Sequence, residues 1–140
     1  MKDKKIGEQI FIRLERGEEI IGQLLAIIPK YGIKLGKVSG IGACSQVTLG
    51  NFDVNEKKYN KATLYGSFEI TNLAGNISEM AGEPYLHVHV TLGDEELRCR
   101  GGHLNAATVS ATCELIITIF EGELERFRDE SSGLNFWKLD

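Results

Sequence analysis

The run ATCELIITIF, residues 111–120, carries the strongest strand signal in this chain. It is dominated by β-branched residues, which fit the pleated surface of a sheet. Around it, short alternating runs are separated by glycine, asparagine or charged turns, which is the pattern of an antiparallel sheet. This pattern predicts further strands at residues 9–14, 43–53, 57–64, 66–71, 73–78, 84–92, 97–101 and 124–128.

A single segment, residues 15–33 (ERGEEIIGQLLAIIPKYGI), has the periodicity of a helix instead. Apolar side chains recur there every three to four residues, as on the buried stripe of an amphipathic helix. Glu18 and Glu19 fall in its expected first turn, Pro29 in its last turn, and Gly32 can end it. One helix among many strands predicts an α+β fold: a single domain over residues 1–140, with a mostly antiparallel sheet and one main helix packed against it.

Composition sets limits on the class of protein. The chain has 140 residues and a formal net charge of −4, so it has no overall attraction for nucleic acid. No apolar run is long enough to span a bilayer, and the charged N-terminal segment does not resemble a signal peptide. Cys44, Cys99 and Cys113 are scattered, which predicts reduced thiols in a cytoplasmic setting and argues against a cysteine-based zinc site.

A glycine-rich segment, GKVSGIGA (residues 36–43), raises the possibility of a phosphate-binding loop. It lacks the GK[ST] ending, the dinucleotide-type glycine spacing and a following helix pattern. We therefore reject a nucleotide-binding loop and expect a backbone turn that uses the conformational freedom of glycine.

The segment PYLHVHV, residues 84–90, combines apolar and histidine positions in alternation. Successive side chains of a strand point to opposite faces of its sheet. Leu86, Val88 and Val90 would therefore face the core, and His87 and His89 would share the other face, about 7 Å apart along the strand. That spacing lets both rings converge on one ion.

The third and last histidine, His103, follows in RGGHL. If Leu92 paired with Leu97 across an even turn, His103 would lie on the wrong face of the sheet. An odd loop length, or a bulge at Gly101–Gly102, would correct the parity. Three neutral imidazoles leave one zinc position open, which would favour hydroxide or a small anionic group.

Simpler interpretations exist for each of these residues. Histidines on a strand often serve packing or lie on the surface, and the residues alone do not decide between these roles and metal binding. Glu69 in GSFEIT is either a solvent-facing carboxylate or a general acid/base near the metal.

Several segments in this order resemble the PPC domain (plants and prokaryotes conserved, also called DUF296). The resemblance runs from about Phe11 to Phe127. It is carried by RLERGEEI (13–20), SGIGACSQVTLG (39–50), YGSFEITNLAGNIS (65–78), PYLHVHV (84–90), RGGHL (100–104) and TCELII (112–117).

The resemblance implies a homotrimer built from an antiparallel sheet and a packed helix. In plants the domain accompanies AT-hook DNA-binding motifs, but this chain has no such hook, and Ser67 replaces the arginine of the plant GRFEIL motif. The prokaryotic fold is similar to acetolactate decarboxylase, which holds zinc with a His-x-His pair and a later histidine. That likeness implies zinc, or another divalent transition metal, at His87, His89 and His103.

The sequence therefore predicts a small homotrimeric metal-binding protein with an open site for a small anionic or carbonyl ligand. It leaves open whether a reaction is catalysed; if one is, Glu69 is the first candidate for proton transfer. The alternatives are a DNA-associated regulatory protein, with direct DNA binding disfavoured by the acidic charge and the missing hook, and a protein-interaction scaffold.

Overall fold

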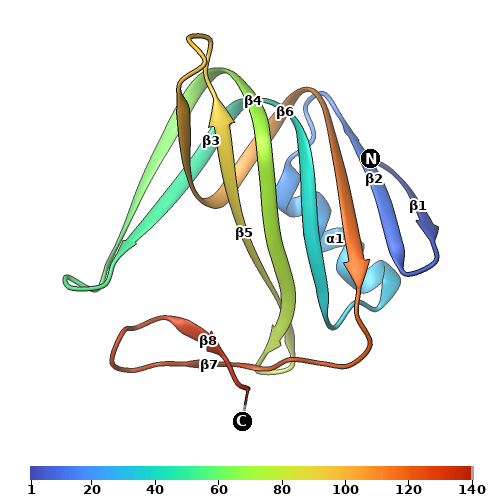
Figure 1. Ribbon diagram of the computed structural model, residues 1–140, viewed down its shortest axis with the longest axis vertical. Helices are drawn as coiled ribbons and strands as arrows, with labels where there is room; N and C mark the ends of the chain where they lie inside the picture. Colours follow the sequence, from blue (N-terminus) through green and yellow to red (C-terminus); the bar gives the residue numbers. More distant parts are fainter. Residues whose placement is uncertain (140) are drawn as a thin grey trace.

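The sheet is organised around strand β6, which contains the ATCELIITIF run. The computed structural model describes residues 1–139 (Figure 1). Its elements are β1 (Lys2–Ile6), β2 (Gln9–Glu15), α1 (Ile20–Tyr31), β3 (Gly36–Asp53), β4 (Lys58–Met80), β5 (Glu83–Gly93), β6 (Cys99–Ile119), β7 (Arg126–Arg128) and β8 (Asn135–Trp137). The predicted α+β fold, with one helix and a mostly antiparallel sheet, is confirmed.

Six strands form the main sheet in the order β1-β2-β6-β3-β4-β5, with every neighbouring pair antiparallel. β6 also pairs with β5, so β3, β4, β5 and β6 close on one another. The far end of β6 pairs instead with β2. The sheet is therefore strongly curled, and one long strand connects its closed part to its open edge (Figure 1).

The strands are longer than the sequence pattern indicated. The three runs predicted between residues 57 and 78 form one continuous strand, β4, in which Gly66 has a φ of +154°. A register shift against β5 lies between Ile70 and Asn72. Local bends and bulges therefore let one strand change direction where the sequence suggested separate strands.

The glycine-rich segment 36–43 is the start of β3 and not a turn, so that prediction was wrong. A Cβ atom added at Gly40 would lie 2.4 Å from Leu115 Cδ2, and one added at Gly42 would lie 2.6 Å from the Cys113 Cα. Neither glycine has a positive φ. They are needed because β3 and β6 approach closely at this point, and not because the chain turns.

Helix α1 begins at Ile20, later than predicted, because Glu15 ends β2 and residues 16–19 form the connection. Glu18 and Glu19 therefore precede the helix, whereas they were predicted to lie in its first turn. Glu19 is the N-cap, and its carboxylate accepts hydrogen bonds from the backbone N–H groups of Ile21 and Gly22. At the other end, Gly32 adopts a left-handed conformation with φ 62° and ends the helix as predicted.

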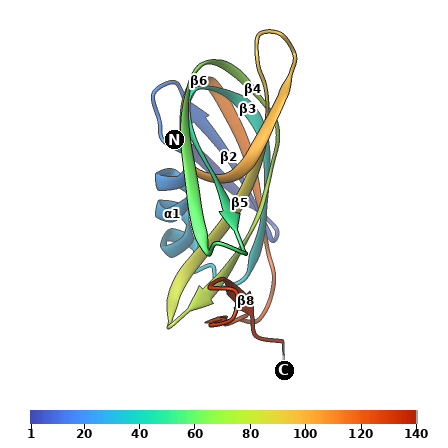
Figure 2. The same cartoon turned by 90° about the vertical axis from the view of Figure 1, so that its left-hand side faces the viewer.

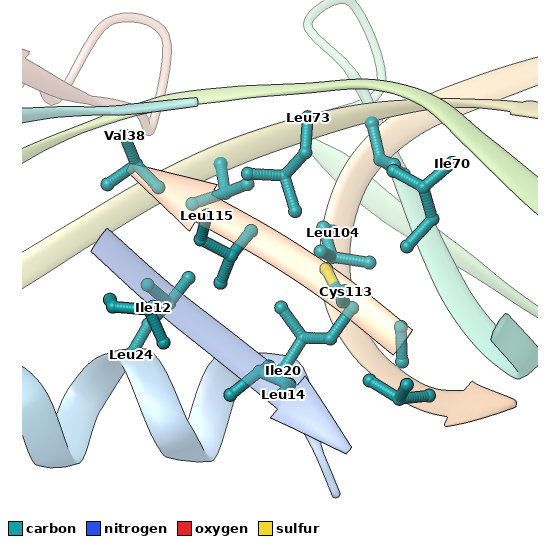
Figure 3. Close-up of a cluster of buried hydrophobic side chains, with 14 of the residues drawn as sticks. Ile12, Leu14, Ile20, Leu24, Val38, Ile70, Leu73, Leu104, Cys113 and Leu115 are labelled. Carbon is teal, nitrogen blue, oxygen red and sulfur yellow. The ribbon is translucent and has the colours of Figure 1, made fainter. Parts of the chain in front are cut away.

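The core lies between α1 and the concave face of the sheet (Figure 3). Ile20 and Leu24 of the helix pack toward Leu14 of β2 and Leu115 of β6, and all four are at most 1% exposed. The alternation of buried and exposed residues in β2 places its other side chains on the opposite face of the sheet.

The last described residues form a small hairpin of β7 and β8. Residues 124–128 were predicted as a strand, and β7 lies within that range, whereas β8 and the N-terminal β1 were not predicted. The hairpin crosses the lower ends of β4 and β5 in Figure 1, and the side view in Figure 2 places it at the same end. The backbone N–H of Glu79 on β4 donates to the Leu124 carbonyl over 2.9 Å and ties the segment down.

Among the described residues, no helix has the length and apolar character needed to cross a membrane.

Candidate metal centre

Strand β5 separates two kinds of side chain, as its sequence predicted. Val88 and Val90 are 1% and 3% exposed and belong to the core. His87 is half-buried and His89 is exposed on the other face. Their Nε2 atoms lie 3.1 Å apart, so the two rings turn toward each other instead of standing parallel. The alternation therefore produces a paired imidazole site on the outside of the sheet.

His103 joins this pair from β6. It is the direct register partner of His89, which places the two side chains on the same face. The loop from Asp94 to Arg98 has an odd number of residues, and the β5–β6 pairing contains no register shift. The odd loop, and not a bulge, is thus what sets the parity.

The glycines before His103 have a different use from the one the sequence suggested. A Cβ at Gly101 would lie 2.8 Å from the Val90 carbonyl oxygen, and one at Gly102 would lie 2.8 Å from the Gly50 carbonyl oxygen. Both therefore permit close approach of neighbouring strands. The β-bulge in this region lies two residues after His103, at Asn105, which has no partner in the pairing of β6 with β3.

The three histidines together make a compact group of nitrogen ligands. One ring nitrogen from each lies within 4.8 Å of those of the other two, and the ring centroids are 5.0 to 5.4 Å apart. Within residues 1–139, no cysteine or carboxylate joins the group. Three imidazoles with no fourth protein ligand are the donor set of an open zinc-type site, so the residues present fit such an ion.

The surroundings favour the neutral, metal-binding form of two of these rings. Burial, followed by the neighbouring His103, His89 and Arg126, lowers the pKa of His87 to about 4. Burial, followed by His89 and Lys61, also lowers the pKa of His103. Neutral imidazole is the form that coordinates a metal, so both rings are ready to act as ligands at neutral pH.

The histidines form part of the wall of a cavity of about 1060 Å³. One side of the cavity is formed by the ends of β3 and β4 that carry Phe52 and Tyr59, and the other by the C-terminal hairpin with Arg126, Arg128 and Trp137. No Asp or Glu is among the residues that line it. The chain has 20 acidic residues and a net charge of −4, so the acid-free wall makes this cavity a locally cationic region.

Arg126 is the residue of this site that sequence reasoning missed. The residue as a whole is 7% exposed. Its guanidinium lies over the Tyr85 ring, 4.6 Å from the ring centroid. Only the alternation of RFR within a predicted strand hinted at an inward-facing arginine, and nothing in the sequence connected that strand to the histidines. The strand register connects Arg126 to the histidines. Asn76 accepts a hydrogen bond from Arg126 and is the β4 partner of His87.

Glu69 lies apart from this cavity. It is exposed on β4 and is not one of the lining residues. Its register partner is Gly93, four residues from His89 along β5, which corresponds to about 13 Å at the usual rise of a strand.

Fold and site together define a class: a one-helix antiparallel domain with a three-histidine group on the outer face of its closed sheet. The sequence model of the Plants and Prokaryotes Conserved (PCC) domain matches residues 1–121, and the chain belongs to this family. The family indicated by the sequence motifs is thereby confirmed. A comparison with curated proteins gives no match.

Solved structures agree with this assignment. A candidate DNA-binding protein from Bacteroides thetaiotaomicron is 33% identical, with a TM-score of 0.96 over 98% of this chain and 96% of the other. A metal-containing protein from Archaeoglobus fulgidus is 34% identical, with a TM-score of 0.87 over 96% of this chain and 95% of the other.

The alpha-acetolactate decarboxylase of Bacillus subtilis shares the fold more distantly. It is 12% identical, with a TM-score of 0.56 over 88% of this chain and 57% of the other. At that identity the likeness concerns the fold alone, and function must be argued from the site.

Proposed function

We propose that this protein binds a zinc-like divalent transition metal through His87, His89 and His103, with one position open to a small anionic or carbonyl ligand. The observation that carries the proposal is the convergence of one ring nitrogen from each histidine within 4.8 Å, in a cavity wall without carboxylates. The A. fulgidus relative, described as metal-containing, adds support. When bound, such an ion would polarise a carbonyl or lower the pKa of a water molecule.

The chain's own residues define what the open position would accept. The ligands are neutral, so they would leave the charge of the ion uncompensated, and the arginines of the wall add to it. A neutral or cationic molecule gains little from this field, whereas a small anion is attracted by it. A carbonyl compound that also carries a negative charge should therefore bind better at this position than a neutral one.

Metal content is the direct test. The protein is prepared without a histidine tag, so that the chain's three histidines are the only ones present. Elemental analysis should find about one zinc-like ion per chain in the parent and none in the His87→Ala/His89→Ala variant. A Cys99→Ser variant is the matched control, because Cys99 is the exposed thiol, and it should retain the metal. Stoichiometric zinc in a folded His89→Ala variant would exclude this ligand set.

Glu69 as a general acid/base stays a prediction, and its exposed position outside the cavity gives it no geometric support. Glu69→Gln should leave both metal content and anion affinity unchanged. A loss of either would place Glu69 in the site after all, through a ligand or a neighbouring subunit.

We further propose that the protein is a homotrimer located in the cytoplasm. Large apolar side chains on the sheet face opposite α1, including Phe11 at 39% and Ile41 at 59% exposure, offer a surface that a second copy could cover. The three free cysteines are consistent with a reducing compartment. Light scattering should give the mass of three 15.5-kDa chains, and Ile41→Glu should shift the protein toward monomers.

A DNA-associated regulatory role is the second candidate, because the 33% identical relative is described as a candidate DNA-binding protein. Phosphate contacts would make duplex affinity fall steeply with salt. Absence of binding at low salt would remove this role and leave a protein-interaction scaffold as the remaining alternative to metal binding.

A further inference from the structure

The charge of Arg126 has no compensating partner among the described residues. Its side chain is buried, yet none of the ion pairs within residues 1–139 includes it. Burial lowers its pKa, but a guanidinium stays charged in proteins. A buried, unpaired charge is unfavourable unless an anion reaches it. The structure supplies room for that anion, because Arg126 lines the cavity.

The hydrogen bonds of Arg126 fix its orientation and leave part of it free. Its Nε donates to the Ser78 hydroxyl over 2.7 Å, and its two terminal nitrogens donate to the Asn135 carbonyl and the Asn76 side-chain oxygen over 2.8 Å each. All three acceptors are neutral. These bonds use three of the five guanidinium N–H groups and leave one on each terminal nitrogen. A carboxylate can accept from such a pair at both of its oxygens.

Aromatic rings hold the guanidinium beside the histidines. Tyr85 and Trp137 lie on it, with their ring centroids 4.6 and 5.5 Å from its central carbon. Tyr85 is two residues before His87, so the two share a face of β5 about 7 Å apart. A ligand on Arg126 therefore lies next to the proposed metal ligands.

We propose that Arg126 is the carboxylate-binding residue of this cavity, and that the ligand is a small carboxylate with a second oxygen group directed at the histidines. A hydroxyl or a similar donor on it would also suit the buried Asn135 Oδ1, which has no hydrogen-bond partner. This inference rests on the proposed metal site only for the ligand's second oxygen group, which would be directed at the histidines. The binding of the carboxylate by Arg126 does not depend on the metal. Arg126 lies beyond residues 1–121, so the family match does not include it.

Binding is measured by isothermal titration calorimetry on the zinc-loaded full-length protein. The ligands are pyruvate and succinate, and dimethyl succinate is the uncharged control. At least one carboxylate should bind and the diester should not. Arg126→Gln should weaken binding by about 10- to 100-fold, as expected for loss of charge-assisted hydrogen bonds. Arg100→Gln removes the same charge from an exposed position outside the cavity, and should stay within about threefold of the parent.

A second variant tests the same role of Arg126 without removing its side chain, in case Arg126→Gln does not fold. Asn76→Asp keeps the size of a side chain that already accepts from Arg126 and gives the guanidinium an internal carboxylate. It should fold as the parent does and lose carboxylate affinity by a similar factor. Failure of every carboxylate to bind the zinc-loaded parent, or parent-like affinity in both variants, overturns the proposal, as does equal affinity for inorganic phosphate.

Zinc content, measured on the same samples, separates the two proposals. If the parent holds no zinc, the metal site is wrong. A carboxylate affinity that still falls in Arg126→Gln under those conditions supports Arg126 independently of the metal.

Discussion

The hydrophobic core and the cavity beside the C-terminal hairpin are lined by opposite faces of the same sheet. On the core side of the sheet, β5 contributes Val88 and Val90 to a closed aliphatic core. Under the hairpin, the alternate residues of β5 supply Tyr85, His87 and His89 to an open cationic cavity. One face stabilises the fold, and the other carries polar groups that packing alone does not require. Changes on the two faces should therefore have separable effects.

The largest separable effect should come from metal. A ligand that binds only the folded state raises the free energy of unfolding. The gain is about 4 kcal/mol when the free ligand concentration is about 1000-fold above the dissociation constant. Denaturant unfolding of the parent should show this gain with zinc, and His103→Ala should lose it. Magnesium, which prefers oxygen ligands, serves as the control and should not stabilise either protein. Equal stabilisation of parent and variant by zinc would contradict the site.

A substitution in the aliphatic core should lower stability and leave metal binding unchanged. Leu73 is 0% exposed in β4, and Leu73→Ala should lower the free energy of unfolding by about 3 kcal/mol through lost burial and a residual cavity. Leu25 is 45% exposed on the helix, so Leu25→Ala should cost less than about 1 kcal/mol. Zinc content per chain, measured on folded samples, should be unchanged in both. Loss of metal in Leu73→Ala would show that the two faces are coupled.

The smallest effect should come from the ion pair that ties β1 to the helix. Lys30 and Tyr31 donate to the Asp3 carboxylate over 2.8 and 2.6 Å, and these hydrogen bonds lower the Asp3 pKa from 3.8. A lowered carboxyl pKa stabilises the fold above pH 3.8, and this contribution is lost as the pH falls below that value. Solvent screening limits it to about 1 kcal/mol or less.

Unfolding of the parent and of Asp3→Asn, compared between pH 7 and pH 2.5, checks this contribution. The two stabilities should differ at pH 7 and converge toward the acid end. A constant difference over the whole range would mean that the carboxylate charge has no part in it.

Sequence reasoning succeeded where the information was local. The two-residue period of PYLHVHV located both faces of β5, and the helical spacing located α1. It failed where an outcome depended on another segment. The glycines of residues 36–43 suggested a turn because the sequence does not show that β6 passes within van der Waals reach of them.

The site shows the same division. The two-residue period of a strand allows His103 to reach the face of His87 and His89 through an odd loop or through a bulge, and only the register distinguishes these alternatives. Arg126 could not be assigned because its neighbours Asn76, Ser78 and Tyr85 lie about 40 to 50 positions earlier in the chain. A polar side chain reveals its role through such neighbours, whereas an apolar one reveals its burial through its own spacing.

The course of β6 also has a consequence for how the molecule is made. Its last residues pair with β2, so that Gln9 lies opposite Thr118, while its first residues place His103 beside His89. On a ribosome, β2 must therefore remain unpaired on this edge until residues 112–118 of β6 have been synthesised. Such distant pairings are slow to form and leave strand edges open to neighbouring nascent chains. The proposed metal site needs His103 of β6 beside His89, so its three histidines cannot come together before that strand has been synthesised.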